Sequence, residues 1–333
     1  MDVSPGVWLA TLGALGLVLI FDISLVLVRP HIPSMRECGG FVVLYASLAV
    51  MFGVGVSAVW GSQRGLEFGA GYLTEYSLSV DNLFVFMVLM ARFRVPAVAQ
   101  QSALLVGIVI ALVLRGLLIG VGAAAIERFS WVFYVFGIFL LWTAWTLARG
   151  EGSSEEEETA GTAARVTAVL NRLIPTTPEY DGNRVRTTVD SRRVFTPLLV
   201  VMVVIGITDL LFALDSIPAI FGLTDQPYLV WTANAFALMG LRQLYFLLGA
   251  MLNRLVFLAA GLSVVLAFIG GKLILSALHT NSFGLINGGA PVSWAPVIPI
   301  WASLLVIIAV LATVTIASLR VTKNTPEAGS PLA

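Results

Sequence analysis

The sequence predicts an all-α integral membrane protein, a polytopic bundle of about nine transmembrane helices that contains an inverted repeat. Three observations predict this class. The 333 residues are 58% hydrophobic and only 11% charged, whereas about a quarter of the residues of a soluble domain are charged. The apolar residues form runs of about 20, the length at which a helix crosses a hydrocarbon core of ~30 Å. A short polar motif also occurs twice, once in each half of the chain.

Short polar connections separate the apolar runs, so each predicted span has a definite range. The nine runs are 7–28, 41–60, 68–91, 100–124, 130–148, 194–221, 228–249, 254–277 and 297–319. The first run is not expected to be a cleaved signal peptide, because no basic segment precedes it and no small-residue cleavage pattern follows it. The mature chain is therefore expected to begin near Met1.

The distribution of basic residues predicts the orientation of the spans. Fourteen of the 19 Lys and Arg residues fall in the odd-numbered connections and the C-terminal tail, and only Arg64 and Arg128 fall in the others. Because basic connections stay in the cytoplasm, the N-terminus is predicted outside and the C-terminus inside. The predicted location is a bacterial inner or plasma membrane.

The spans divide the chain into two membrane halves. Residues 1–148 hold spans one to five, 194–320 hold spans six to nine, and 321–333 form a cytoplasmic tail. The polar segment 149–193 joins the halves on the cytoplasmic side. Its run SSEEEE is expected to be disordered or solvated rather than a site. Its seven arginines roughly balance its eight acids, so we expect no binding of nucleic acid.

The repeated polar motif is TEYSLSVDN at 74–82 and TDLLFALDS at 208–216. Each copy has a threonine, an acid, five further residues, an aspartate, and then an asparagine or a serine. The span after each copy carries an arginine, Arg115 in the first half and Arg242 in the second. The predicted topology gives the two copies opposite orientations, which is typical of the inverted repeats of secondary transporters.

Helical geometry spreads the polar groups of each motif over a broad arc. Positions seven apart nearly coincide on a helix, whereas the two acids of one motif point about 120° apart. Pro218 follows the second motif closely and removes one backbone donor, which predicts a break in the sixth span. Such a break would bring the two acids of the motif to one cavity and free carbonyl oxygens as further ligands.

The predicted spans carry more acids than bases. The deep acids are Asp22, Glu75, Asp81, Asp209 and Asp215, and the bases are Arg115, Arg242 and Lys272. An ionised residue at the bilayer centre costs ~2.5–3.5 kcal/mol, so pairing with the bases is expected to account for part of this charge. The two remaining negative charges require either protonation or a visiting cation, and both suit a transporter that handles cations.

The available ligand atoms narrow the choice of cation. The two motifs offer carboxylates together with the side-chain oxygens of Asn82 and Ser216, and no predicted span holds a deep histidine. Such oxygen ligands favour hard ions such as Mn²⁺, Mg²⁺ or Ca²⁺ over Cu⁺ or Zn²⁺. We expect Arg115 and Arg242 to hold or neutralise the acids when no metal is bound, with Lys272 and Asp22 as supporting charges.

Four stretches resemble the TerC family of integral membrane proteins, which is named for tellurium resistance and includes the Alx-type proteins. They are RLIPTTPEYDGNR at 172–184, EYSLSVDNLFVF at 75–86, DLLFALDSIPAIFGLTDQP at 209–227 and WTANAFALMGLRQLYFLL at 231–248. The resemblance covers about 40–320 and implies export of manganese by a carrier related to LysE-type exporters. It implies that the metal-site acids are Glu75, Asp81, Asp209 and Asp215, with Asn82 and Ser216 beside them.

Two functional hypotheses follow from the sequence. The first is an exporter of Mn²⁺, or of another hard divalent cation, that works by alternating access and exchanges the metal for protons or moves it as a uniporter. The second is a membrane scaffold or insertion or stress-response factor without transport activity. An enzyme is not expected, because the signatures of intramembrane proteases are absent, and no phosphate-binding loop or permanent cofactor site is found. The oligomeric state stays open.

Overall fold

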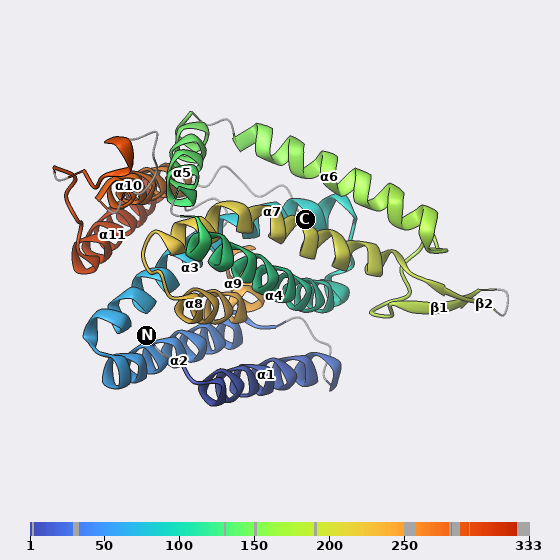
Figure 1. The fold of residues 1–333 in the computed structure, drawn as a ribbon. Helices are drawn as coiled ribbons and strands as arrows, with labels where there is room; N and C mark the ends of the chain where they lie inside the picture. Colours follow the sequence, from blue (N-terminus) through green and yellow to red (C-terminus); the bar gives the residue numbers. More distant parts are fainter. Residues whose placement is uncertain are drawn as a thin grey trace.

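The computed structural model is almost entirely helical (Figure 1). It describes residues 1, 3–28, 33–129, 131–149, 152–189, 192–249, 257–279, 281, 287–292 and 294–324. The helices are α1 (Pro5–Val28), α2 (Met35–Trp60), α3 (Ser62–Arg92), α4 (Ala97–Arg128), α5 (Val132–Ala148), α6 (Gly152–Leu173), α7 (Pro197–Phe221), α8 (Pro227–Met239), α9 (Leu241–Gly249), α10 (Leu258–His279) and α11 (Ile300–Asn324). A 3₁₀ turn spans Asn287–Gly289, and strands β1 (Arg186–Val189) and β2 (Arg192–Phe195) form an antiparallel hairpin.

Seven of the described helices are long and apolar enough to cross a membrane: α1, α2, α3, α4, α7, α10 and α11. This confirms the predicted class of a polytopic helical membrane protein. The fifth predicted span corresponds to α5, which has only 17 residues, and the seventh corresponds to α8 and α9 together. The count of nine spans and the inverted repeat stay predictions.

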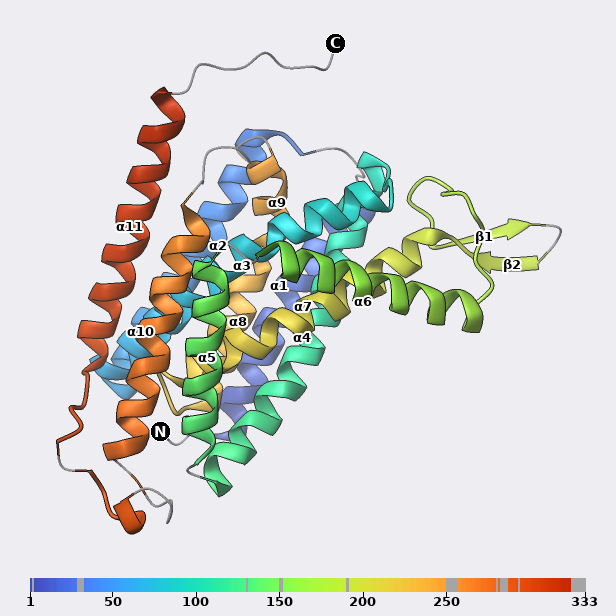
Figure 2. The same ribbon diagram turned by 90° about the horizontal axis from the view of Figure 1, so that it is seen from above.

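The helices that carry the polar motifs lie in the middle of the bundle. Helix α3 packs against α2, α7 and α8, and α4 packs against α7 and α8. Helices α1 and α2 lie on one side of this group, and α5, α10 and α11 lie on the other (Figures 1 and 2). The polar side chains of the central helices are therefore shielded from the surroundings by apolar helices.

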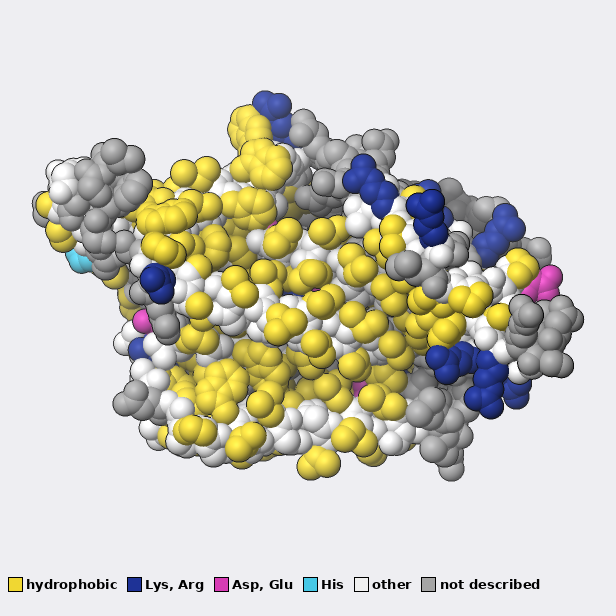
Figure 3. Space-filling view, turned by 45° about the vertical axis from the view of Figure 1, so that its right-hand side comes forward, with side chains coloured by type: hydrophobic (Ala, Val, Ile, Leu, Met, Phe, Trp, Pro, Cys, Tyr) yellow, Lys and Arg dark blue, Asp and Glu magenta, His cyan; other side chains and the backbone are white. Residues whose placement is uncertain are grey.

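The outer surface of the bundle fits a lipid environment. Figure 3 shows a face on which hydrophobic side chains form a broad band, with most of the visible basic side chains toward the end that carries α6 and the hairpin. Large apolar side chains such as Leu117, Val121 and Ile138 are exposed on the bundle. Because a soluble protein rarely exposes so many contiguous apolar groups, this surface is suited to hydrocarbon.

The acidic run of the segment 149–193 lies within helix α6, so the expectation that it is disordered is wrong, and the alternative that it is solvated stays a prediction. Helix α6 lies against α7, where Ala163, Val166 and Leu170 join an apolar cluster with Leu198. The connection that follows α6 is held to the bundle by the Tyr180 hydroxyl, which donates to the carbonyl of Phe93 at 2.8 Å. This contact with α7 is made by apolar residues that recur at helical spacing within a polar segment. The sequence prediction rested on the acidic run and did not use them.

The predicted break at Pro218 is wrong. Helix α7 continues through Pro218 to Phe221, because the proline lies near the end of the helix and removes only one hydrogen bond. The neighbours Ile217 and Ile220 are also fully packed in an apolar cluster. A helix ends instead at Gly240, where α8 stops and α9 begins.

Glycines allow α5 and α10 to approach closely. A β-carbon on Gly137 would lie 2.6 Å from Cγ1 of Ile274, and one on Gly270 would lie 2.9 Å from the carbonyl oxygen of Gly137. Small residues at helix contacts are a common device of membrane proteins, because they let the backbones touch. A β-carbon on Gly271, next along the chain, would meet no neighbouring element within 4 Å among the described residues.

These two adjacent glycines make a matched pair for mutation. We expect Gly270→Ala to lower the melting temperature of the purified protein by several degrees, because its methyl group meets a backbone oxygen and leucine side chains of α5. Gly271→Ala should leave the melting temperature unchanged or raise it, since alanine favours a helix by about 0.5–1 kcal/mol over glycine. Thermal unfolding in detergent measures both, and equal effects at the two positions would contradict the close contact.

Candidate functional site

The first acids of the two polar motifs meet at one arginine. Helix α3 supplies Glu75, α7 supplies Asp209 and α4 supplies Arg115. The Arg115 guanidinium binds Asp209 through two hydrogen bonds, Nε to Oδ2 at 2.6 Å and Nη2 to Oδ1 at 3.1 Å. Its Nη1 group forms an ion pair with Oε1 of Glu75. All three residues are 1% exposed or less, so this charged triad lies entirely inside the bundle.

Hydroxyl groups from the same motifs surround the triad. Nη1 of Arg115 also donates to Oγ of Ser216 at 3.3 Å, and the Ser79 hydroxyl donates to Oε1 of Glu75 at 3.3 Å. The second carboxylate oxygen of Glu75 and the hydroxyl of Thr74 are buried and have no hydrogen-bond partner among the described residues. The triad is therefore one part of a larger polar centre rich in oxygen atoms.

The packing of the three helices explains why these side chains converge. Contacts between Gly71 and Ile220 and between Phe86 and Phe212 show that α3 and α7 run in roughly opposite directions. Helix α4 approaches α7 through glycines, because Gly206 packs against Ile110 and leaves no room for a β-carbon. Arg115 therefore reaches Asp209 on the adjacent α7, and also Glu75 on α3, which packs against α7.

The charges of the triad do not balance. One guanidinium faces two carboxylates at a site where burial removes the stabilisation that water would give to each charge. Hydrogen bonding by the arginine offsets part of that cost, and its planar group suits the bidentate contact with Asp209. The remaining negative charge makes the centre attractive to a proton or to a metal cation.

The structure describes fewer contacts for the other predicted ligands. Asn82 is buried on α3, and Asp215 is half-buried on α7 and has an interaction partner. The side chain of Asp81 lies outside what the structure describes, although its backbone belongs to α3. Among the described side chains, no three His, Cys, Asp or Glu groups gather as a metal-binding cluster. The structure thus brings together Glu75, Asp209 and Ser216 from the predicted set.

Arg242, the predicted counterpart of Arg115, contacts neither polar motif in the described part of the chain. Its Nη2 group binds Oδ1 of Asp22 at 2.8 Å, and the hydroxyl of Tyr45 donates to the same oxygen at 2.9 Å. These contacts join α9 to α1 and α2, and all three side chains are buried. This second ion pair holds helices together. Arg242 balances the charge of Asp22, so no bound cation is needed to explain that buried acid.

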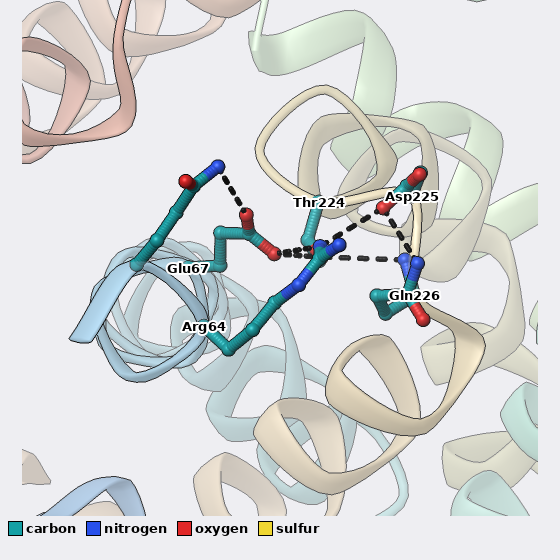
Figure 4. A network of polar contacts seen from close by, with 6 residues as sticks. Arg64, Glu67, Thr224, Asp225 and Gln226 are labelled. Atoms are coloured by element: carbon teal, nitrogen blue, oxygen red, sulfur yellow. Dashed lines mark hydrogen bonds and ion pairs between the residues drawn. The ribbon is translucent and has the colours of Figure 1, made fainter. Parts of the chain in front are cut away.

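A third polar network involves Glu67, which the sequence prediction missed (Figure 4). Its Oε2 accepts from Arg64 at 2.7 Å and from the Thr224 hydroxyl at 2.7 Å. The predicted supporting base Lys272 lies on α10, which is not one of the three helices that form the Arg115 triad. The spacing of Arg64 and Glu67, three residues apart just before the predicted third span, was the signal that could have revealed the network.

This network continues into the connection between α7 and α8. Arg64 donates to Oδ1 of Asp225 at 3.1 Å, and the Gln226 amide donates to the same oxygen at 2.8 Å. Burial disfavours ionisation of Asp225, but these hydrogen bonds and the charge of Arg64 outweigh it, so its pKa lies below the ordinary value. The start of α3 is therefore tied to the connection that follows α7.

The fold and the buried charges define a polytopic helical membrane protein with an ionisable centre. The model of the TerC family of integral membrane proteins matches residues 60–326. The chain belongs to the TerC family, which confirms the resemblance found in the sequence. Helix α1, which provides Asp22, precedes the matched region.

Similar proteins occur in distant organisms. An uncharacterized membrane protein of Mycobacterium tuberculosis is 45% identical over 292 residues, which cover 88% of this chain and 74% of the relative. The thylakoid membrane protein TERC of Arabidopsis thaliana is 42% identical, with 70% and 60% covered. A Photorhabdus laumondii protein that carries the name putative membrane-bound redox modulator Alx is 34% identical, with 90% and 96% covered. No solved structure shows significant similarity to the chain.

The charge imbalance of the triad predicts how stability responds to mutation. Arg115→Gln should lower the free energy of unfolding by about 3–5 kcal/mol, because it leaves two buried carboxylates without their cation. Adding Asp209→Asn should recover part of this loss. Titration with a denaturing detergent, followed by tryptophan fluorescence, measures the effect.

Arg128→Gln is the matched control, since this arginine lies exposed at the end of the same helix. Its effect should stay within about 0.5 kcal/mol. Equal losses for the Arg115→Gln single variant and the double variant would show that charge balance is not what Arg115 provides.

Proposed function

We propose that this protein exports a hard divalent cation from the cytoplasm by alternating access, and that this cation is Mn²⁺. The observation that supports the proposal is the meeting of Glu75 and Asp209 at the buried guanidinium of Arg115. These acids occupy the same position in the two copies of the motif, and the copies come from different halves of the chain. A site at the interface of repeats is typical of secondary transporters.

In this proposal the cation and Arg115 compete for the same carboxylates. With Arg115 in place, the two acids and the arginine together carry one negative charge. A divalent cation between the acids would neutralise both of them and release the arginine from its contacts. Such competition provides two alternative states of one buried site, which alternating access requires.

The cation would be held by oxygen atoms. Ser216 lies within reach of the triad, and Asp81, Asn82 and Asp215 are the further ligands that we propose from the motif pattern. Carboxylate, hydroxyl and amide oxygens suit Mn²⁺, Mg²⁺ and Ca²⁺. Protons that enter from the outside would compete for the same carboxylates and promote release of the metal, so exchange for protons is part of the proposal.

The proposed orientation places α6 and the hairpin in the cytoplasm. Most basic residues of the connections belong to that side of the sequence-based topology, and basic connections are retained in the cytoplasm. The export direction then runs from the α6 end of the bundle toward the end that carries the Arg64 and Glu67 network.

The projecting segment supports a second candidate function. Helix α6 and the hairpin extend beyond the bundle (Figure 2), as a docking platform of a membrane scaffold would. In that case deletion of 152–189 would abolish function while substitution of the buried acids would leave it intact. The exporter proposal expects loss of function from the substitutions.

Cellular manganese provides the test of the export proposal. A bacterial host without its own manganese exporters is challenged with Mn²⁺, and total manganese is measured by elemental mass spectrometry at matched expression. The wild type should lower cell manganese several-fold. Glu75→Gln and Asp209→Asn should raise it to the level of the empty vector, because each removes a carboxylate from the centre, and Asp81→Asn and Asp215→Asn should do the same.

Asp22→Asn is the matched control, since it neutralises a buried acid that pairs with Arg242 away from the triad. It should lower stability and retain export once expression is equalised. Wild-type cells that accumulate as much manganese as the empty vector would rule out the exporter, provided that calcium and magnesium are also unchanged.

A further inference from the structure

Three buried side chains, two on α3 and one on α8, keep polar atoms without hydrogen-bond partners among the described residues. The unpartnered atoms are Oγ1 of Thr74, Oε2 of Glu75, and both the oxygen and the nitrogen of the Asn234 amide. Thr74 and Asn234 are each 1% exposed. The remaining unpartnered side-chain atoms of the described residues lie singly on α4, α9 and α11 and in the connection before β1. Because buried polar groups in proteins are normally hydrogen-bonded, a concentration of exceptions requires an explanation.

The neighbours of α8 indicate which way Asn234 faces. Val230 packs with Ile217 and Ile220 of α7, and Trp231 packs against Gly116 of α4. Asn234 follows these residues by four and three positions, so it lies on the same face of α8 one turn further along. It is therefore directed toward the junction of α7 and α4, which provide Asp209 and Arg115.

The unpartnered atoms of α3 lie on the face of that helix that is turned toward α7 and α8. Gly71 is in contact with Ile220 of α7 and Ala233 of α8. Thr74 and Glu75 follow Gly71 by three and four positions, so they continue its face by one turn. The contact between Tyr76 and Gly240 shows that α3 and α8 advance in the same direction, which keeps Asn234 within about one turn of this level.

The unpartnered state is not general for polar residues of α8. Thr232, also fully buried, donates its hydroxyl to the backbone carbonyl of Tyr228 at 2.8 Å. The hydroxyl of Thr232 is thus satisfied within its own helix, and the residue lies on a different face from Asn234. The two residues therefore form a matched pair, one with free polar atoms directed at the acidic centre and one without.

We propose that Asn234 and Thr74 are ligands of the transported cation, together with the second carboxylate oxygen of Glu75. This inference rests on the proposed function and extends its site to α8, which neither polar motif includes. The three oxygens come from an amide, a hydroxyl and a carboxylate, so they replace water molecules with mostly neutral ligands. A site that replaces water with these oxygens favours Mn²⁺ over Mg²⁺, because Mg²⁺ gives up its bound water reluctantly.

The test measures metal binding directly, apart from transport. The purified full-length protein in lipid nanodiscs is titrated with radioactive Mn²⁺, and Mg²⁺ is then added as competitor. We expect Asn234→Leu and Thr74→Val to raise the Kd for Mn²⁺ at least tenfold, and to weaken the preference over Mg²⁺. Thr232→Val should bind like the wild type.

A gain of affinity guards against variants that fail to fold. Asn234→Asp places a carboxylate where the neutral amide lies, so it should lower the Kd for Mn²⁺ and make binding weaken more steeply with falling pH. Wild-type affinity in Asn234→Leu, Thr74→Val and Asn234→Asp alike would overturn the ligand assignment and leave the exporter proposal standing. Absence of Mn²⁺ binding by the wild type itself would instead overturn both.

Discussion

The contact of Arg115 with Glu75 and Asp209 is the interaction on which the interior of this protein depends. Two ionised carboxylates buried in a bundle with an apolar outer surface need a counter-ion, and Arg115 is the cation that the described structure places between them. The guanidinium connects α3, α4 and α7 at one point. These contacts therefore hold the three central helices together at the buried acids.

The other polar contacts tie the rest of the bundle to this centre. Asp22 and Arg242 attach α1 to α9, and Glu67 with Arg64 and Thr224 attaches the start of α3 to the connection after α7. Both networks involve helices that belong to the triad or pack against its helices. Close glycine contacts, such as that of Gly206 with Ile110, then set the separation of the helices.

The sequence predicted the class of fold and named both acids as candidate site residues, because both follow from local patterns. It did not predict that Glu75 and Asp209 meet each other at one arginine. Apolar runs of about 20 residues define the spans, and an acid within such a run is conspicuous. The acid with which each arginine pairs was less predictable. Arg115 and Arg242 occupy similar settings in the sequence, yet the first pairs with both motifs and the second pairs with Asp22, since the choice depends on which helices are neighbours. Asn234 was inconspicuous for the same reason, because a single amide within an apolar helix gives no local signal of its facing. Pro218 failed as a signal of a break because the packing of Ile217 and Ile220 stabilises the end of α7.

In the proposed transport cycle, Arg115 and the cation occupy the same two carboxylates in turn. The most direct test is the rise in melting temperature that millimolar Mn²⁺ gives to the purified wild type and to Arg115→Gln, with choline at equal ionic strength as the control. A ligand stabilises a protein in proportion to RT ln(1 + [L]/Kd), so removal of the competing guanidinium should make the Mn²⁺ shift clearly larger in Arg115→Gln than in the wild type. A shift that is equal or smaller in the variant would contradict the competition between the arginine and the metal.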